Sequence, residues 1–244
     1  MNNFSKFKGF VRTAAGYASD LLKRDFRNFK NRTAILLNKK PDPFDCYKFL
    51  VDTNKNMGIK SLYFFLLGDY GTNDKNHPAS NLKFQTLIKH IADYSEIGIH
   101  PSFGSTDNLH QMKVEVSRLT NISHKQIVKS RQHFSILKFP QTYEFLLQAG
   151  ITEDYSMGYT NINGFRASYC YPFKWYNLDD ESTSALEVHP FAISESTINY
   201  FSELEKKNFA ELTKPIIDEV RKYQGELVSI FHNNSFTEGF IISG

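Results

Sequence analysis

The sequence predicts an α/β fold in which parallel strands alternate with crossover helices. Three observations support this prediction. Segments with helical spacing of apolar residues alternate with short apolar runs from residue 41 onward, an order typical of parallel strands joined by helices. Polar residues directly follow several of these runs. The chain has 244 residues, of which 41% are hydrophobic and 23% charged, and this is ordinary composition for one large globular domain.

The first half of this pattern predicts three helices and two strands. Asp42 and Pro43 have the properties of an N-cap and a first helical residue, and Gly58 ends the helix that they begin. A continuous apolar run then indicates a strand over 61–67 that is buried on both faces. The following elements are a helix over 84–91, a strand over 96–100 and a helix over 109–119.

The second half continues the alternation. A helix begins at Pro140, and Gly150 stands where a C-terminal cap is expected. A further helix over 209–220 is preceded by Ser202 and Glu205 at capping-box spacing. The expected strands are 127–133, 186–191 and 227–231. A barrel and an open sheet both fit, and in either one ligand sites lie at the carboxyl ends of the strands.

The charge is concentrated at the N-terminus. Residues 1–40 hold ten basic and two acidic residues, a net charge of +8, whereas the rest holds 19 basic and 24 acidic residues, a net charge of −5. We expect 1–40 to form a basic amphipathic segment that packs on a domain spanning 41–244. Contact with a membrane surface is an open alternative. Nucleic acid is not an expected partner, because the aromatic motifs of the common RNA-binding modules are absent.

Composition also bears on location. The longest strongly apolar run, 62–67, is far shorter than the roughly 20 residues that a membrane span needs. The N-terminus has no secretory signal pattern, and two cysteines cannot form a disulfide framework. We therefore expect a cytoplasmic protein without a transmembrane segment, with peripheral attachment to a membrane left open.

Three histidines stand at the ends of predicted strands, namely His100, His133 and His232. Neutral imidazole is the commonest metal ligand and also serves as a general acid or base. A single histidine of this kind is more often structural, but three at equivalent strand ends indicate a site. The sequence lacks HExxH, zinc-spaced cysteines, Walker A, GxGxxG and GxSxG motifs. Metal-assisted hydrolysis, lyase chemistry and binding without catalysis are the classes that are left.

Six motifs appear in a fixed order: FFLLGDYGTNDKN (64–76), EIGIHPSF (96–103), SRQHF (130–134), GITEDYSMGY (150–159), GFRASYCYPF (164–173) and FHNNSF (231–236). In this order and combination the stretch from about Lys60 to Asn234 resembles the polysaccharide deacetylase superfamily, the NodB-homology group of carbohydrate esterase family four. It is most similar to a bacterial branch often found with surface-polysaccharide genes. The resemblance implies a distorted (β/α) barrel with fewer than eight strands.

The resemblance also implies an activity and roles for individual residues. The activity is hydrolysis of an N-acetyl group on a sugar, assisted by a divalent metal, with zinc the first expectation. His100 matches the first metal histidine of the family. Arg131 matches an arginine that orients the catalytic carboxylate, and His232 matches the histidine that protonates the leaving amine.

The sugar groove is assigned less specifically. The candidates to line it are Asp154, Tyr159, Arg166 and Trp175. Aromatic faces suit sugar rings, but a packing role for Trp175 is equally open.

The sequence departs from the family pattern in two places. Gly104 stands where the family has its second metal histidine, and we expect His133 to supply a metal ligand instead. No strand ending in an acidic pair precedes residue 40, so we expect a barrel that is incomplete at the N-terminus. Asp69 is the carboxylate expected to serve as catalytic base, because Gly68 and Gly71 leave room around it. Asp154 and Glu195, near other strand ends, are alternatives.

The predicted function is therefore a metal-dependent polysaccharide deacetylase that acts on a bacterial surface polysaccharide or its precursor. The alternative is a catalytically inactive relative that binds a saccharide or a protein partner. The missing acidic pair favours the alternative, whereas His100, Arg131 and His232 favour the enzyme. The sequence indicates neither the sugar nor the oligomeric state.

Overall fold

The computed structural model describes residues 7–37, 39–40, 45–198 and 208–236. The chain divides after Leu50 and after His232 into two compact units, and each is described by itself. The first unit holds two helices, the start of α3 (Tyr47–Met57) and the 3₁₀ turn η3 (Asn233–Phe236). The second unit, from Val51 to His232, holds all the strands and the remaining helices.

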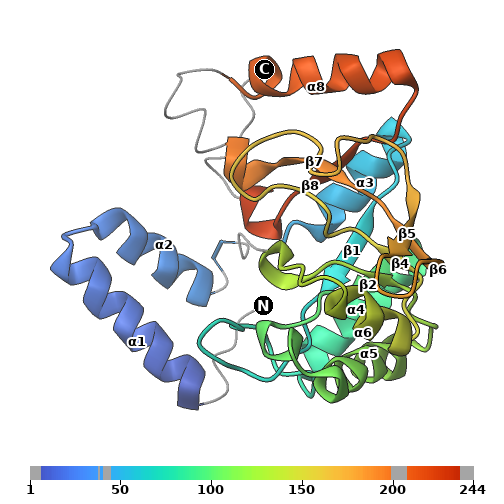
Figure 1. Cartoon of the computed structure of the whole chain (residues 1–244). Helices are drawn as coiled ribbons and strands as arrows, with labels where there is room; N and C mark the ends of the chain where they lie inside the picture. The colour runs from blue at the N-terminus through green and yellow to red at the C-terminus, as the bar shows by residue number, and fades with distance from the viewer. Residues whose placement is uncertain (1–6, 38, 41–44, 199–207, 237–244) are drawn as a thin grey trace. The chain divides into compact units, whose positions relative to one another are not determined.

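The first unit begins with a helical hairpin of α1 (Phe7–Leu22) and α2 (Phe26–Leu36), drawn in blue in Figure 1. Tyr17 packs edge-on against Phe29, with ring centroids 4.8 Å apart. Arg32 pairs with the buried carboxylate of Asp20 at 2.9 Å. The predicted basic amphipathic segment is therefore a helical hairpin, and its packing on the rest of the chain stays a prediction.

The second unit is built on a six-stranded sheet with the order β1-β2-β3-β4-β6-β5. All neighbouring strands are parallel except β5 and β6, which form an antiparallel hairpin. The strands are β1 (Leu62–Phe65), β2 (Glu96–Ile99), β3 (Lys129–Ser130), β4 (Glu153–Asp154), β5 (Phe173–Asn177) and β6 (Ser182–Val188). This mostly parallel sheet confirms the predicted α/β class, whereas the β5–β6 hairpin was not predicted.

A second sheet pairs β7 (Phe191–Ser194) with β8 (Val228–Ile230) in parallel. The strand predicted over 186–191 is therefore wrong: it is divided between β6 and β7, which belong to different sheets. The interruption coincides with Pro190, and a proline cannot donate to a strand ladder. Among the described strands no closed barrel forms.

The strand predicted over 127–133 is also shorter in the structure. β3 ends at Ser130, because the backbone N–H of Gln132 donates to the Ser156 hydroxyl instead of continuing a ladder. A 3₁₀ turn, η2 (His133–Ser135), follows, in which Phe134 has a φ of 55°. This left-handed conformation is strained for a residue other than glycine.

Amphipathic helices cover the sheet (Figure 1). Asn81 and Asn108 cap α4 and α5 by accepting hydrogen bonds from backbone N–H groups of the first turn. α8 begins with a capping box of Asn208 and Glu211, whereas the predicted box at 202 and 205 lies outside the described residues. The bounds are α4 (Leu82–Tyr94), α5 (Leu109–Ser123), α6 (Gln141–Gln148) and α8 (Phe209–Tyr223).

The core lies between the sheet and the helices. Fully buried apolar side chains come from strands, helices and the loops beside them: Leu67, Ile88, Ile91, Ile99, Met112, Leu119, Leu146, Ile151 and Leu186. Burying one such side chain contributes about 1.5–3 kcal/mol, and this packing fixes the strand ends relative to one another. Within the described ranges, no helix combines the length and apolar character that crossing a membrane requires.

Candidate functional site

The three histidines that were predicted at strand ends gather in one place. His100 follows β2, His133 opens η2 just after β3, and His232 follows β8. The rings of His100 and His133 are 5.0 Å apart, centroid to centroid. Charges on Arg131 and His232 also act on His100. Parallel pairing of β2 and β3 brings His100 and His133 together, and His232, at the end of a strand of the second sheet, is near enough for its charge to act on His100.

The ring of His100 is held by a backbone carbonyl beyond the neighbouring strand. Its Nδ1 lies 2.5 Å from the carbonyl oxygen of Arg131. A carbonyl only accepts, so Nδ1 carries the proton and Nε2 has a free lone pair. Burial, followed by the charges of Arg131 and His133, lowers the pKa of His100 well below its ordinary value. His100 is therefore a neutral imidazole, the form in which histidine binds metals.

His133 is oriented by a carboxylate that sequence reasoning did not select. Its Nδ1 lies 2.9 Å from Oδ1 of Asp74, whose side chain is only 7% exposed. Asp74 also accepts hydrogen bonds from the backbone N–H groups of Phe103 and Gly104 at 2.8 and 3.1 Å. The His133 ring stacks on Phe134 with centroids 4.0 Å apart. Asp74 thus joins the loop after β1 to the loops after β2 and β3.

His232 has its own carboxylate partner. Glu195, directly after β7, accepts hydrogen bonds from both the backbone N–H and the Nδ1 of His232. Burial alone raises the pKa of Glu195, but the hydrogen bond and charge of His232 outweigh it and lower the pKa overall. Glu195 is buried, whereas the His232 side chain is 55% exposed. The pair therefore combines a fixed carboxylate with an accessible imidazole.

Arg131 places a buried positive charge beside these pairs. Burial lowers its pKa to about 10, against the opposing effect of the Glu195 and Asp154 carboxylates, so it remains cationic at neutral pH. Its guanidinium lies 5.6 Å from the ring centroid of Phe191. Two buried atoms here have no hydrogen-bond partner among the residues that the structure describes, Nε of Arg131 and Oε2 of Glu195. The site thus holds an unused donor and an unused acceptor.

Asp154 lies fully buried in β4, where it holds the residues that precede the site. Its carboxylate accepts hydrogen bonds from the hydroxyls of Ser130 and Ser156, both at 2.7 Å, and from the Ser156 N–H at 3.0 Å. Burial raises the pKa of Asp154, and these hydrogen bonds and Arg131 offset the increase only in part. The position fits a supporting group better than a residue that lines a sugar groove.

The remaining predicted residues lie apart from the histidine cluster or at its margin. Trp175 is buried in β5 and packs edge-on against Tyr143 at 5.3 Å, which favours its packing role. Tyr159 is half-buried and Arg166 is exposed, both in the segment between β4 and β5. Asp69, the expected catalytic base, is 74% exposed and pairs with Arg118 at 2.9 Å.

Asp74 is thus the loop carboxylate that meets the histidines. It stands five positions after Asp69 in the same motif, 64–76. Both are acidic residues in a polar loop, and the residue pattern contains no signal that separates them. The contacts with His133 and two backbone N–H groups separate them in the structure.

A buried layer supports the loop that follows His100. Glu115 of α5, fully buried, accepts hydrogen bonds from the Ser102 N–H at 2.9 Å and the Ser102 hydroxyl at 2.6 Å. Burial raises the pKa of Glu115 in spite of these bonds. A Cβ at Gly68 would lie 2.4 Å from Cβ of Ser102, so only glycine permits the loops after β1 and β2 to approach this closely.

The residues of the cluster could supply some, but not all, of the ligands of a metal ion. His100 and His133 each use Nδ1 for a protein partner and leave Nε2, the arrangement typical of metal-binding histidines. A catalytic zinc ion usually has three protein ligands. Within the described part of the chain, no three His, Cys, Asp or Glu side chains are grouped to hold a metal. These residues supply two imidazoles and fall one ligand short.

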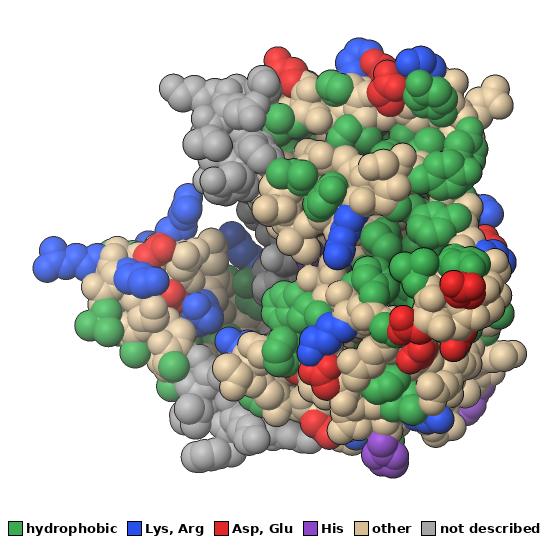
Figure 2. Space-filling model, in the orientation of Figure 1, with side chains coloured by type: hydrophobic (Ala, Val, Ile, Leu, Met, Phe, Trp, Pro, Cys, Tyr) green, Lys and Arg blue, Asp and Glu red, His purple; other side chains and the backbone are tan. Residues whose placement is uncertain are grey.

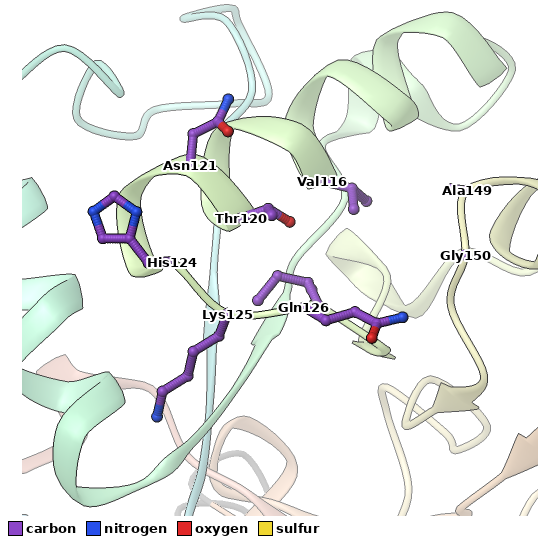
Figure 3. A pocket seen from close by; sticks show the side chains of 9 residues that line it. Val116, Thr120, Asn121, His124, Lys125, Gln126, Ala149 and Gly150 are labelled. Atoms are coloured by element: carbon purple, nitrogen blue, oxygen red, sulfur yellow. The ribbon is translucent and has the colours of Figure 1, made fainter.

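A cavity of about 520 Å³ lies elsewhere, where the C-terminal end of α5 meets the turn after α6. Its polar side chains diverge from one another, as Figure 3 shows for His124, Lys125 and Gln126. The Lys125 ammonium is already bonded to the carbonyl of Ala92. No polar groups converge there as they do at the strand-end histidines.

Comparisons with known proteins bear on the fold. The structure is similar to the crystal structure of a Mycobacterium smegmatis protein provisionally described as a polysaccharide deacetylase, with a TM-score of 0.55 and 13% sequence identity. The match covers 94% of this chain and 76% of that chain. No family model and no curated protein matches the sequence. At this identity the likeness shows a shared mixed α/β fold.

Proposed function

We propose that this protein is a polysaccharide deacetylase, a hydrolase that removes N-acetyl groups from a saccharide. A divalent metal assists the reaction, and zinc is the first metal to test. The observation that carries the proposal is the cluster of His100, His133 and His232 around Arg131 at the strand ends. The likeness in fold to a protein described as a polysaccharide deacetylase supports the same reaction class.

In this proposal His232 is the general acid. Its Nδ1 is held by Glu195, and the exposed side chain presents Nε2 to substrate. Glu195 fixes the ring and favours the imidazolium form. This form protonates the leaving amine as the amide C–N bond breaks, while a water molecule supplies the hydroxyl that completes acetic acid and its remaining proton restores the imidazolium. Such proton transfer typically contributes about 10²–10⁴-fold to a rate. Arg131 supplies the buried positive charge that favours the ionised forms of Glu195 and Asp154.

His100 and His133 are the candidate metal ligands through their Nε2 atoms. Asp74 replaces Asp69 as the important loop carboxylate, and it acts through His133 as a positioning residue. Because two imidazoles do not complete a metal centre, the role that the chain's own residues carry is proton donation by His232. The substrate class that follows from the resemblance is a bacterial surface polysaccharide or its precursor.

The test is acetate release from N-acetylglucosamine oligomers by the full chain, measured with and without added Zn²⁺, beside elemental analysis of the purified protein. We expect acetate release that needs the metal and is lost in His232→Ala. A His133→Ala variant should hold less metal and otherwise stay folded. Acetate release that is unchanged in His232→Ala would overturn the proposal.

A saccharide-binding protein without turnover is the second candidate. It is favoured by the incomplete metal centre and by the position of Asp69 away from the histidines. Binding of the same oligomers in a calorimeter, with no acetate released under any metal condition, would support this candidate over the enzyme.

A further inference from the structure

The turn that joins α1 and α2 reverses the usual distribution of polar and apolar side chains. Asp20, whose partner is Arg32, is 8% exposed, and a Cβ at Gly16 would touch the Arg32 guanidinium. At the turn, in contrast, Leu22 is 86% exposed and Phe26 61%. Large apolar side chains gathered in the open are a common sign of an interaction surface.

Basic side chains surround these apolar ones. We call residues 21–27 the hairpin tip. Within it Lys23, Arg24 and Arg27 are exposed beside the apolar residues, and Figure 2 shows hydrophobic and basic side chains together on the surface of this hairpin. The one acidic residue, Asp25, directs its carboxylate to α2, where it accepts hydrogen bonds from the backbone and side-chain amides of Asn28 at 3.0 and 2.7 Å.

The hairpin tip has a defined conformation. Backbone N–H groups of Arg24 and Asp25 donate to the carbonyls of Leu21 and Asp20 at 3.0 and 2.8 Å. The Tyr17 hydroxyl bonds to the Thr33 hydroxyl at 2.9 Å and thereby holds the two helices together. The apolar and basic side chains are thus presented by a preformed turn, so little ordering is needed on binding.

We propose that the hairpin tip binds an anionic lipid surface. Leu21, Leu22 and Phe26 enter the boundary between headgroups and acyl chains, and the three basic side chains contact lipid phosphates. Exposed apolar residues flanked by lysine and arginine are what interfacial helices use for this purpose. The net charge of +8 in residues 1–40 points the same way.

Charge also argues against the two other occupants. A second copy of the chain would bring Lys23, Arg24 and Arg27 against the same three cations. A nucleic acid would satisfy the cations but would leave Leu21 and Leu22 in water. Only an anionic lipid surface offers both negative phosphates and an apolar layer beneath them.

The test is flotation of the full chain with phosphatidylcholine vesicles that contain or lack phosphatidylglycerol. We expect flotation only with the anionic vesicles and its loss at high salt, because exposed charges are screened. Two variants should each reduce binding at least about tenfold: Leu22→Ser with Phe26→Ser, and charge reversal at Lys23, Arg24 and Arg27. Each variant removes one of the two interactions that this type of interfacial binding combines.

Matched controls lie in the second unit. Leu178→Ser removes a side chain that is 81% exposed, and a variant with Arg221→Glu and Lys222→Glu reverses two exposed cations. Both should float like the wild type. Equal loss in these controls, or equal flotation with neutral vesicles, would contradict the proposal, as would binding of single-stranded RNA that is weakened by the charge reversal alone.

Insertion has a readout of its own. In a Leu22→Trp variant, brominated lipid acyl chains should quench the fluorescence of the introduced indole. The single native tryptophan, Trp175, is buried, and its fluorescence should not be quenched. Absence of quenching would overturn insertion. Release of acetate from soluble oligomers should not change in the tip variants, so membrane binding and the proposed enzyme activity can fail separately.

Discussion

His189 contacts carboxylates, as His133 and His232 do, yet its ring is enclosed, whereas the His232 side chain is 55% exposed. Register pairs Lys129 with Glu153 and Glu153 with Glu187, so these side chains share one face of β3, β4 and β6. On this face Nδ1 of His189 lies 2.8 Å from Glu226, and Nε2 lies 3.6 and 3.7 Å from Glu187 and Glu153. The ring also stacks on Tyr155.

The other face of the same strands supports the site. Ser130 and Asp154, the residues next to Lys129 and Glu153, are hydrogen-bonded there. At the adjoining strand ends, His133 and His232 each give Nδ1 to a carboxylate and leave Nε2 for another partner. The comparison shows that a carboxylate contact does not by itself identify a reactive histidine. The useful sign is access: the His232 side chain is 55% exposed, whereas Nε2 of His189 is buried and has no hydrogen-bond partner among the described residues.

The largest effects are expected from replacing His232 and His189, one histidine of each kind. His232→Ala should lower the rate of acetate release by about 10²–10⁴-fold, the usual contribution of a general acid, and should cost stability only through the lost pair with Glu195. His189→Ala should leave the rate nearly unchanged. It should cost about 1–3 kcal/mol of unfolding free energy, because the ring separates Glu153, Glu187 and Glu226.

Kinetics of acetate release and urea denaturation of both variants would check this pair of effects. Glu226→Gln is the matched control for His189→Ala, since it removes a charge but keeps the ring and its stacking on Tyr155. A large loss of rate in His189→Ala with unchanged stability would contradict the assignment.

The two loop aspartates allow a second comparison. Asp74→Ala removes the acceptor of two backbone N–H groups and of His133 and should cost about 1–3 kcal/mol, since buried donors lose their partner. Asp69→Ala removes an exposed partner of Arg118 and should cost at most about 1 kcal/mol. Urea denaturation would measure both. Equal costs would show that Asp74 is no better anchored than Asp69.

The pH dependence of stability should sharpen the contrast within the site. The pKa of Glu195 is lower in the folded chain than its ordinary value of 4.5, through His232. Its contribution to stability is therefore present above the unfolded pKa and is lost as pH falls through the folded pKa. Glu195→Gln should be less stable than the wild type at neutral pH, and this difference should shrink toward acid.

Urea denaturation at several pH values would follow this difference. Asp154→Asn should show the opposite sign, because burial raises the pKa of Asp154. The raised pKa gives a contribution that is present below the unfolded pKa and is lost as pH rises through the folded one. Parallel pH profiles for the two variants would argue against both assignments.

The smallest change in unfolding free energy is expected on the face of β3, β4 and β6 that carries Lys129, Glu153 and Glu187. Lys129 bonds to Glu153 and lies 3.3 Å from Glu96, and its side chain is 16% exposed. Lys129→Met keeps the apolar stem but removes the charge, so we expect a loss of about 1 kcal/mol or less in urea denaturation, as for ion pairs with access to water. A loss as large as that of His189→Ala would show that the ion pairs, and not the enclosed ring, hold this face together.

The sequence predicted the elements better than their boundaries. The apolar run at 61–67 predicted β1, and Pro140 with Gly150 bracketed α6 correctly. The predicted strand over 186–191 was wrong because the ladder changes sheets near Pro190. The end of β3 was missed for a related reason: Gln132 bonds to Ser156, a contact between loops that no periodicity records.

The same limit applies to the site. The sequence predicted His100, His133 and His232 at equivalent strand ends of one sheet. Parallel pairing of β2 and β3 brings His100 and His133 together, whereas His232 follows a strand of the second sheet. The role of Asp69 stays a prediction, and the sequence did not single out Asp74 in the same polar loop. Only the fold shows that Asp74 meets the backbone of Phe103 and Gly104.

By itself, then, the sequence determined the alternation of helices and strands, the position of three histidines at strand ends, and the basic character of the first helical hairpin. The tertiary structure alone decided which carboxylate serves His133 and which serves His232. Asp74 and His133 are 59 positions apart, and Glu195 and His232 are 37 apart. Periodicity reports which face of its own element a side chain occupies, whereas these pairs form between elements that meet only when the core packs.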